Sequence, residues 1–465
     1  MLQESEAPIP ASVRASRRGR LLLRECSIPE GSLIFTAAFL ISAALGVVRQ
    51  VLFNAQFGAG MEASAYYAAF RLPDTLTSLI AGGALSNALI PVLVSAARSG
   101  GRAAEERVAS LTLTTLAAAV ALAALAAAAL APAFVDRVLA PGFDRPTAAL
   151  TVTLTRIMLA QSVLVVASSV ALAVLNSRSQ FLLAGLAIVT HNLTLIAGIL
   201  AARLYPPLGI YGPALGVLGD AVLQLAILWP GLRANRLRLR PAWDLADRRL
   251  RQVLRLLAPN GLSAAVNYAG TIVDTAFASL AHAPAGLPAL YNASLLMGLP
   301  VRLIGVALGQ AAFPRLAGHA AAGDWRRMRL TLRWSLLVVA VLAGAAFVGL
   351  WLFGRQTIRI LFERGQFGAD AGQLTYALLV IFAAGMPSYV MTEVLTRGLI
   401  ALHDTQTPLF TNCGQLAVRA LLIWLLLDSL GIAAIPLAAV VSSALETLAL
   451  ALVLYARLRR AARSM

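Results

Sequence analysis

The residues of this sequence best suited to a functional role are ionisable side chains that lie inside apolar segments. Within or near such segments lie six arginines, five carboxylates and one histidine: Arg49, Arg71, Arg156, Arg302, Arg397, Arg419, Asp74, Asp220, Asp274, Glu393, Glu446 and His191. A charged group in lipid costs several kcal/mol unless it is paired or faces water. These residues therefore predict a polar pathway through a membrane, used for binding and transport.

Two apolar segments, one in each half of the chain, combine an arginine with a proline. Arg71 precedes Pro73 and Asp74 in a segment whose centre is Ala-Gly-Gly-Ala, and Arg302 follows Pro300. Proline removes a backbone donor and lets a helix bend. Interrupted helices at matching positions of a repeat transporter surround its binding site. We therefore predict a central anion-binding cavity around Arg71 and Arg302; prolines that only shape packing are the alternative.

The other embedded charges have more than one interpretation. Arg49, near the outer part of the first span, either lines the cavity or reaches the membrane interface. Glu393 and Arg397 are four residues apart on one predicted helix and can form an ion pair, structural or functional. Together with Asp74 and Asp274, these two residues are candidates for gating or coupling.

His191 and Asp220 have a structural interpretation that competes with a proton relay. Asn192 and Gln224 are close to them in sequence and could satisfy them by hydrogen bonds. We interpret the pair as buried structural polar residues.

The composition indicates an all-α, polytopic membrane protein. Of 465 residues, 59% are hydrophobic and 13% charged, and the mean hydropathy is +0.78. Spans of about 20 apolar residues must be helical, because lipid offers no partner to backbone groups. We predict twelve spans: 31–54, 65–96, 109–136, 149–175, 181–203, 210–230, 252–281, 287–316, 331–353, 372–402, 408–428 and 432–456.

Several function classes are excluded by what the sequence lacks. The net charge of +17 would suggest nucleic acid, but no soluble domain is left to bind it. The sequence contains no phosphate-binding loop, HExxH helix or Cys/His cluster. We therefore predict a transporter and not an enzyme, without a metal or cofactor.

The chain is built from two related halves. ALSNALIPVL at 84–93 is echoed by ALGQAAFPRL at 307–316, and weaker echoes follow at the same spacing.

Most loop arginines fall on the side of the termini, which predicts that both termini are cytoplasmic. The 231–251 linker alternates arginine with leucine, which suits an anionic leaflet or simply a positive-inside loop. The predicted domains are a basic tail (1–30), a six-helix lobe (31–230), a basic amphipathic cytoplasmic linker (231–251), a second six-helix lobe (252–456) and a basic tail (457–465).

Several motifs resemble the MurJ/MviN family of lipid II flippases, within the multidrug/oligosaccharidyl-lipid/polysaccharide exporter superfamily. They include LGVVRQVLFNAQFGAGM (45–61), AAFRLPDTLTSLIAGGALSNALIPVL (68–93), GVALGQAAFPRL (305–316), LFERGQF (361–367) and RGLIALHDTQTP (397–408). The resemblance implies two lobes forming a V around a cationic cavity. It also implies alternating access in the bacterial inner membrane, carrying an undecaprenyl-pyrophosphate-linked disaccharide pentapeptide for peptidoglycan synthesis.

The resemblance assigns substrate binding to individual residues of the cavity. Arg49 and Arg71 match arginines of the family, whereas uncharged Ala43, Ser64, Gly82 and Leu295 stand where relatives commonly carry a charge. Arg302, two helical turns after Leu295, is expected to compensate. The cavity is therefore expected to be poorer in charge than the family norm.

Three alternative functions remain open at this stage. One is a flippase for another polyprenyl-pyrophosphate-linked saccharide. A second is a cation-coupled drug or metabolite antiporter that depends on Asp274, Asp220 or Glu446. The third is a transport-inactive scaffold that recruits cell-wall synthesis enzymes through its basic loops. Anionic lipids are expected partners through the same loops.

Overall fold

The computed structural model describes residues 26–81, 84–235 and 237–461, and the regular elements in these ranges are all helices. Residues 1–25 and 462–465 of the two predicted tails, and Gly82, lie outside the described residues. The helices of the first half are α2 (Ile28–Phe57), α3 (Met61–Ala69), α4 (Arg71–Ala81), α5 (Ala84–Phe134), the π-helix η1 (Val135–Leu139), α6 (Arg145–Leu159), α7 (Gln161–Ser177), α8 (Phe181–Leu204), η2 (Pro206–Leu208) and α9 (Tyr211–Ala234).

The second half repeats this helical organisation after a non-helical connection. Its helices are α10 (Arg248–Leu280), α11 (Gly286–Val301), the π-helix η3 (Arg302–Val306), α12 (Ala307–Ala321), α13 (Trp325–Leu361), α14 (Ala369–Ala384), α15 (Met386–Ala401), α16 (Gln406–Leu430), η4 (Gly431–Ala433) and α17 (Ala434–Ala461).

Each of the twelve predicted spans falls, within the described residues, on a helix or on consecutive helices with short breaks. By length and hydropathy alone, eight helices of the described chain could cross a membrane, or nine if the bent pair α14 and α15 is counted as one span. The count is lower than twelve because the runs Leu85–Leu139 and Gln406–Ala461 each take in parts of two predicted spans, and because α10 is not among the counted helices. Gly101 divides the first of these runs, since its φ of 63° is not helical.

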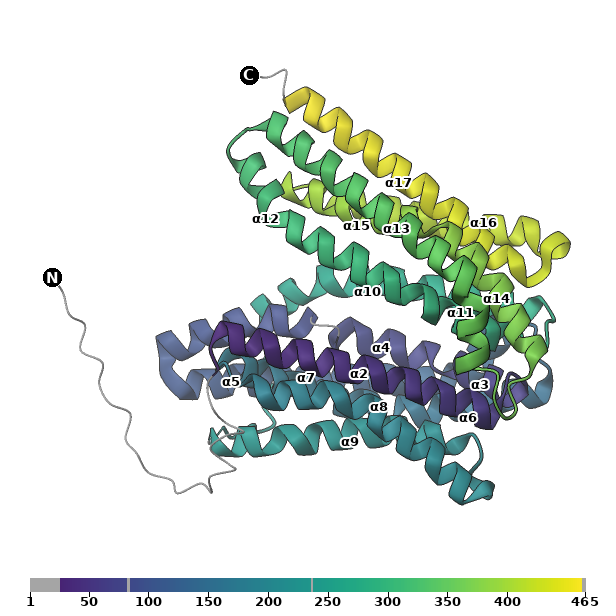
Figure 1. The fold of residues 1–465 in the computed structure, drawn as a ribbon. Coiled ribbons are helices and arrows are strands. Elements are labelled where there is room, and N and C mark those ends of the chain that lie inside the picture. The colour runs from purple at the N-terminus through teal and green to yellow at the C-terminus, as the bar shows by residue number, and fades with distance from the viewer. Residues whose placement is uncertain (1–25, 82–83, 236, 462–465) are drawn as a thin grey trace.

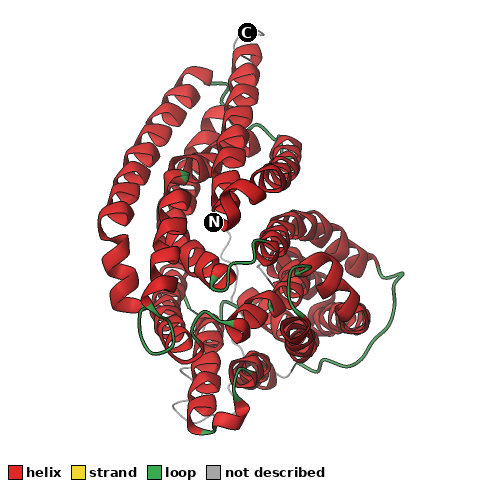
Figure 2. Ribbon diagram, turned by 90° about the vertical axis from the view of Figure 1, so that its right-hand side faces the viewer, coloured by secondary structure: helices red, strands yellow, loops and turns green. Residues whose placement is uncertain are grey.

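The helices form two lobes that meet at one end. The first lobe holds α2 to α9, and the second holds the latter part of α10 together with α11 to α17 (Figure 1). They meet near α3, α6, α11 and α14 and separate toward the side where α2 begins and α17 ends. We call these ends the closed side and the terminal side. After a quarter turn the same two groups of helices are seen, joined by loops (Figure 2). The predicted all-α fold with two lobes in a V is confirmed.

Helix α10 contacts both lobes. Its first part places Val253 and Leu257 in the apolar core of the first lobe. Its second part packs on α16 and α11 of the second lobe. A single rigid helix thereby links the two halves.

The connection between the lobes runs without helical structure along the terminal end of α5. Leu237 packs into the core of the first lobe, whereas Arg238 and Arg240 are exposed. Alternate backbone N–H groups of the connection donate over 3.1–3.4 Å to polar side chains spaced one turn apart on α5: Arg238 to Glu106, Arg240 to Ser110 and Ala242 to Thr114. The alternation of leucine and arginine therefore fits a segment laid across a helix.

Asp247 holds the end of this connection. It caps α10 by accepting from the backbone N–H groups of Arg249 and Leu250 at 2.9 and 3.2 Å, and it accepts from Arg107 at 3.3 Å. Burial alone would raise the pKa of the Asp247 carboxyl. The hydrogen bonds from Leu250, Arg249 and Arg107 outweigh burial and hold this pKa below its ordinary value. The contribution of the Asp247 carboxylate to folding stability is thus fully present above the ordinary pKa of aspartate. It is lost only as the pH falls through the lower pKa that Asp247 has in the folded protein.

Asp247→Ala is expected to loosen the connection, because it removes both the helix cap and the partner of Arg107. Loss of such a cap costs about 1 kcal/mol of stability, which corresponds to a roughly fivefold higher population of molecules in which the connection is detached. Trypsin should therefore cleave after Arg238 and Arg248 about five times faster than in the wild type. Asp370→Ala, which removes an exposed carboxylate from the first turn of α14, is the control. Equal cleavage rates for Asp247→Ala and the wild type would contradict this role.

Candidate functional site

A polar cavity lies between the lobes, near the closed side. Its volume is ≈ 120 Å³, and a second cavity of ≈ 200 Å³ adjoins it, because Arg71 and Tyr291 line both. We call the two cavities together the interlobe chamber. The first is lined mainly by the first lobe, through Arg49, Gln50, Phe53, Tyr66, Tyr67, Phe70, Arg71, Asp74, His191, Leu195, Ile199 and Tyr291. The second is lined mainly by the second lobe, through Thr271, Asp274, Thr275, Leu287, Leu290, Tyr291, Ser294, Leu295 and Arg71.

Arg71 reaches from the first lobe to the second. Its Nε donates to the Thr275 hydroxyl of α10 at 3.0 Å, and Thr275 is fully buried. The centre of its guanidinium lies 6.0 Å from the centroid of the Tyr291 ring on α11, within the range of a cation–π contact. The remaining guanidinium nitrogens can meet an anion in the chamber.

Arg49 and Asp74 face the same cavity as Arg71. Arg49 comes from α2, and Asp74 follows Arg71 by three residues on α4. Asp74 interacts electrostatically with Arg71, His191 and Arg49. The carboxylate is therefore an internal counter-ion for the cationic groups of the chamber.

A buried amide cluster, which the sequence analysis missed, closes the chamber. Gln50 Nε2 donates to the Asn292 Oδ1 at 2.8 Å and to the Tyr67 hydroxyl at 2.6 Å, and Asn54 Nδ2 donates to the same Asn292 oxygen at 3.1 Å. Gln50, Asn54 and Asn292 are at most 2% exposed. Their isolation as amides within apolar segments is the signal that could have identified them. These bonds join α2 of the first lobe to α11 of the second.

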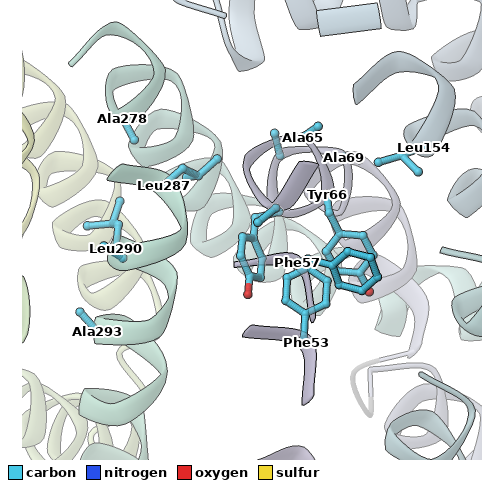
Figure 3. Packing of buried hydrophobic residues seen from close by; sticks show 14 of the residues in the cluster. Phe53, Phe57, Ala65, Tyr66, Ala69, Leu154, Ala278, Leu287, Leu290 and Ala293 are labelled. Carbon is cyan, nitrogen blue, oxygen red and sulfur yellow. The ribbon is translucent and has the colours of Figure 1, made fainter. Parts of the chain in front are cut away.

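Aromatic rings surround the amide cluster. The rings of Tyr67 and Tyr291 stack across the interface, with centroids 4.2 Å apart. Figure 3 shows Phe53, Phe57 and Tyr66 gathered in the first lobe, with Leu287 and Leu290 on the second-lobe helix across from them. The chamber therefore has a largely apolar wall on its closed side.

Backbone contacts seal the chamber farther out. The Gln366 N–H donates to the Ala55 carbonyl at 2.9 Å, and the Gly142 N–H donates to the Ser279 hydroxyl at 3.1 Å. A Cβ at Gly142 or at Gly365 would clash with backbone of the other lobe. Glycine at these loops is required for the lobes to approach this closely.

Arg302 lies apart from the residues that line the chamber. It begins the π-helix η3, directly after α11, and it is exposed. Neither cavity of the chamber includes it among its lining residues. Leu295, where the family resemblance would place an arginine, does line the second cavity. The structure thus brings Arg49, Arg71 and Asp74 together and leaves Arg302 outside.

The ion pair predicted for Glu393 and Arg397 is absent among the described side chains, so this prediction is wrong for the structure. The stems of both residues instead pack against small residues of η3 and α12. A Cβ at Gly305 would lie 3.4 Å from Glu393 Cγ, and one at Gly309 would lie 3.6 Å from Arg397 Cγ. Helical spacing permits the pair, but packing against the neighbouring helix determines where the side chains point.

Asp274 forms an ion pair with Arg419 across α10 and α16. Both side chains are only 17% exposed. The second carboxylate oxygen of Asp274 and the Nε of Arg419 are buried without a hydrogen-bond partner. Sequence spacing could not predict this pair, because its members are 145 residues apart. Asp274 is thereby neutralised inside the second lobe, beside the chamber.

His191 and Asp220 satisfy each other, and not through the neighbours that sequence analysis proposed. His191 Nδ1 lies 2.9 Å from Asp220 Oδ2, and the Thr190 hydroxyl donates to Asp220 Oδ1 at 2.7 Å. Asn192 instead donates to the Ser42 carbonyl of α2 at 2.8 Å. The partners of His191 and Asp220 are therefore set by the packing of α8 on α9 and not by their neighbours in the sequence.

The described residues contain no group of three or more His, Cys, Asp or Glu side chains that could hold a metal ion. The chamber offers guanidinium, imidazole, hydroxyl and amide groups instead. Such groups suit a phosphorylated ligand with an apolar portion.

Comparisons with known proteins agree with this architecture. A family model described as lipid II flippase MurJ matches residues 53–464. The probable lipid II flippase MurJ of Rhizobium tropici is 29% identical over 425 residues, covering 90% of this chain and 79% of that protein.

Solved structures show the same fold at lower identity. A lipid II flippase MurJ in an inward closed conformation gives a TM-score of 0.76 at 21% identity, covering 90% of this chain and 86% of that chain. An inward-facing multidrug resistance MATE family transporter of the MOP superfamily also gives 0.76, at 12% identity, over 93% of this chain and 99% of that chain. Since the family model spans most of the sequence, this multi-pass membrane protein belongs to the lipid II flippase MurJ family.

Proposed function

We propose that this protein carries lipid II from the inner to the outer leaflet of the bacterial cytoplasmic membrane by alternating access. The observation that carries the proposal is the position of Arg49 and Arg71 in a chamber between two lobes. Membership of the lipid II flippase family supports the identity of the substrate. The protein is a transporter, since moving the lipid requires no covalent step.

In this proposal Arg49 and Arg71 bind the pyrophosphate of the substrate. A guanidinium offers parallel N–H donors that match phosphate oxygens, and it keeps its charge at any physiological pH. Asp74 balances these charges while the chamber is empty. When the substrate binds, its pyrophosphate takes the place of the Asp74 carboxylate as the partner of the arginines, and the prenyl chain remains in lipid. Because Leu295 is uncharged, the second-lobe wall of the chamber meets the substrate through Thr275 and Tyr291 and not through an arginine.

The terminal side is cytoplasmic in this proposal. The arginine-rich loops lie at that side, as the positive-inside rule requires. The lobes separate toward it and are sealed at the opposite side (Figure 1). The described arrangement therefore corresponds to a state that loads substrate from the inner leaflet. Exposed Arg238 and Arg240 on the connection support contact with anionic headgroups.

Arg71 couples binding to the closure of the lobes. Its contacts with Thr275 and Tyr291 cross the interface, so an anion that turns the guanidinium competes with them. Opening on the outer side must also break the amide cluster and the contact between Gln366 and Ala55. The polar bonds of this gate can be exchanged for water at low net cost, whereas the apolar and aromatic contacts around them cost free energy in proportion to the area exposed.

The antiporter alternative receives less support from the structure. Asp274 is paired with Arg419, and Asp220 is held by His191 and Thr190. These two carboxylates therefore already have partners within the protein, whereas Glu446, the third candidate, has no hydrogen bond or ion pair among the described side chains. Asp274 has the role of a structural charge that holds α10 on α16.

Arg71→Gln is expected to weaken the binding of lipid II by at least about tenfold. One charge-assisted hydrogen bond contributes ~1.5–3 kcal/mol, and 1.4 kcal/mol corresponds to a factor of ten. Binding is measured on the purified full-length protein, and translocation in proteoliposomes with fluorescent lipid II. The control is Arg156→Gln, because exposed Arg156 donates to the Ala128 carbonyl and does not line the chamber. Equal affinity for Arg71→Gln and the wild type would refute the site.

A disulfide across the closed side is expected to stop transport. Ala55→Cys and Gln366→Cys, in a chain whose Cys26 and Cys413 are replaced by serine, place two thiols at a backbone contact of 2.9 Å. Oxidation should abolish translocation, and a reductant should restore it, because alternating access requires the lobes to part there.

A disulfide within one lobe is the matched control for this experiment. Thr392 and Thr447 lie 2.8 Å apart, oxygen to oxygen, inside the second lobe. Their cysteine pair should form without stopping transport. Full translocation by the oxidised 55–366 pair would rule out opening at this side.

A further inference from the structure

A histidine held by a buried carboxylate faces the chamber beside the arginines. His191 lines the same cavity as Arg49 and Arg71, and its side chain is 42% exposed. Asp220, which lies behind it on α9, is only 8% exposed and is also bound by Thr190. The ring is therefore fixed from the buried side and open toward the cavity.

The carboxylate determines which ring nitrogen is free. Asp220 Oδ2 lies 2.9 Å from His191 Nδ1, and a carboxylate oxygen at this distance accepts a hydrogen bond from the tautomer that is protonated at Nδ1. This leaves Nε2 as the nitrogen that can meet a ligand. A neutral ring presents a lone pair there, whereas a protonated ring presents an N–H donor with a positive charge.

The charged surroundings of the ring come from three helices. Asp220 faces it from α9, Arg49 from α2 and Asp74 from α4. The hydroxyls of Tyr66, Tyr67 and Tyr291 belong to the same cavity. The other elements packed against α8, namely α7 and η2, carry no ionisable side chain. Arg71 lines the same cavity, so a protonated ring brings the positive charges to three against the two carboxylates.

We propose that His191 is a proton-dependent ligand of the substrate pyrophosphate, positioned by Asp220 and acting together with Arg49 and Arg71. This inference rests on the proposed function. Protonation adds a charged donor to a chamber that has only two arginines in its first cavity. The family commonly carries a charged residue at the position of Leu295. The protonated imidazole thereby supplies part of the positive charge that is missing there.

The test compares the affinity of the full-length protein for lipid II at pH 6 and pH 8. The pyrophosphate of lipid II is a diester, so its own charge does not change over this range. The wild type should bind about tenfold more tightly at pH 6, the ratio expected from one charge-assisted hydrogen bond. His191→Gln should bind at both pH values as weakly as the wild type does at pH 8.

Two further variants separate this role from a structural one. His191→Arg carries a permanent charge and should bind at pH 8 as tightly as the wild type at pH 6. Arg49→Gln should bind more weakly at both pH values while keeping the tenfold ratio. A structural histidine would change the stability of the protein without changing these ratios.

The outcomes distinguish this inference from the proposed function. Binding by the wild type with equal affinity at both pH values, or a tenfold ratio retained in His191→Gln, would overturn the role of His191 alone. No binding of lipid II by the wild type at either pH would overturn the proposed function itself.

Discussion

The structure depends on one constraint, which is that a polar group surrounded by lipid must find its partner inside the protein. Backbone groups satisfy this requirement by forming helices, so the regular elements of the described chain are helices. Side chains satisfy it through tertiary contacts. Asp274 is bound to Arg419, Asp220 to His191, and Gln50 to Asn292. Each of these bonds also ties two helices together.

The same constraint explains why the two lobes can separate. Within each lobe, apolar side chains fill a continuous core. Between the lobes, the closed side adds amides, stacked tyrosines and close glycine contacts to an apolar cluster that joins Phe53 of the first lobe to Leu287 of the second. Hydrogen bonds exchanged for water cost little net free energy, whereas parting the apolar side chains costs free energy in proportion to the area exposed. The polar contacts therefore lower the cost of opening at this side.

The chamber is asymmetric even though the chain is a repeat. Arg49, Arg71 and His191 come from the first lobe, and the second lobe contributes Thr275 and Tyr291 around Arg71. The cations of the chamber are therefore in contact with the interface between the lobes. Arg302 of the second half lies in η3 and does not line either cavity of the chamber.

The sequence by itself determined the helical class and the positions of the spans, because these depend on local hydropathy. It also predicted Arg49, Arg71 and Asp74 from their residue types, and these three residues line one cavity in the structure. Only the tertiary structure decided the partners of the embedded charges. Asp274 and Arg419 are 145 residues apart, and Gln50 and Asn292 are 242 apart, so no local pattern connects them. The spacing of Glu393 and Arg397 suggested a contact that packing against η3 and α12 prevents. Spacing along one helix limits which side chains can meet, but neighbouring helices determine which of them do.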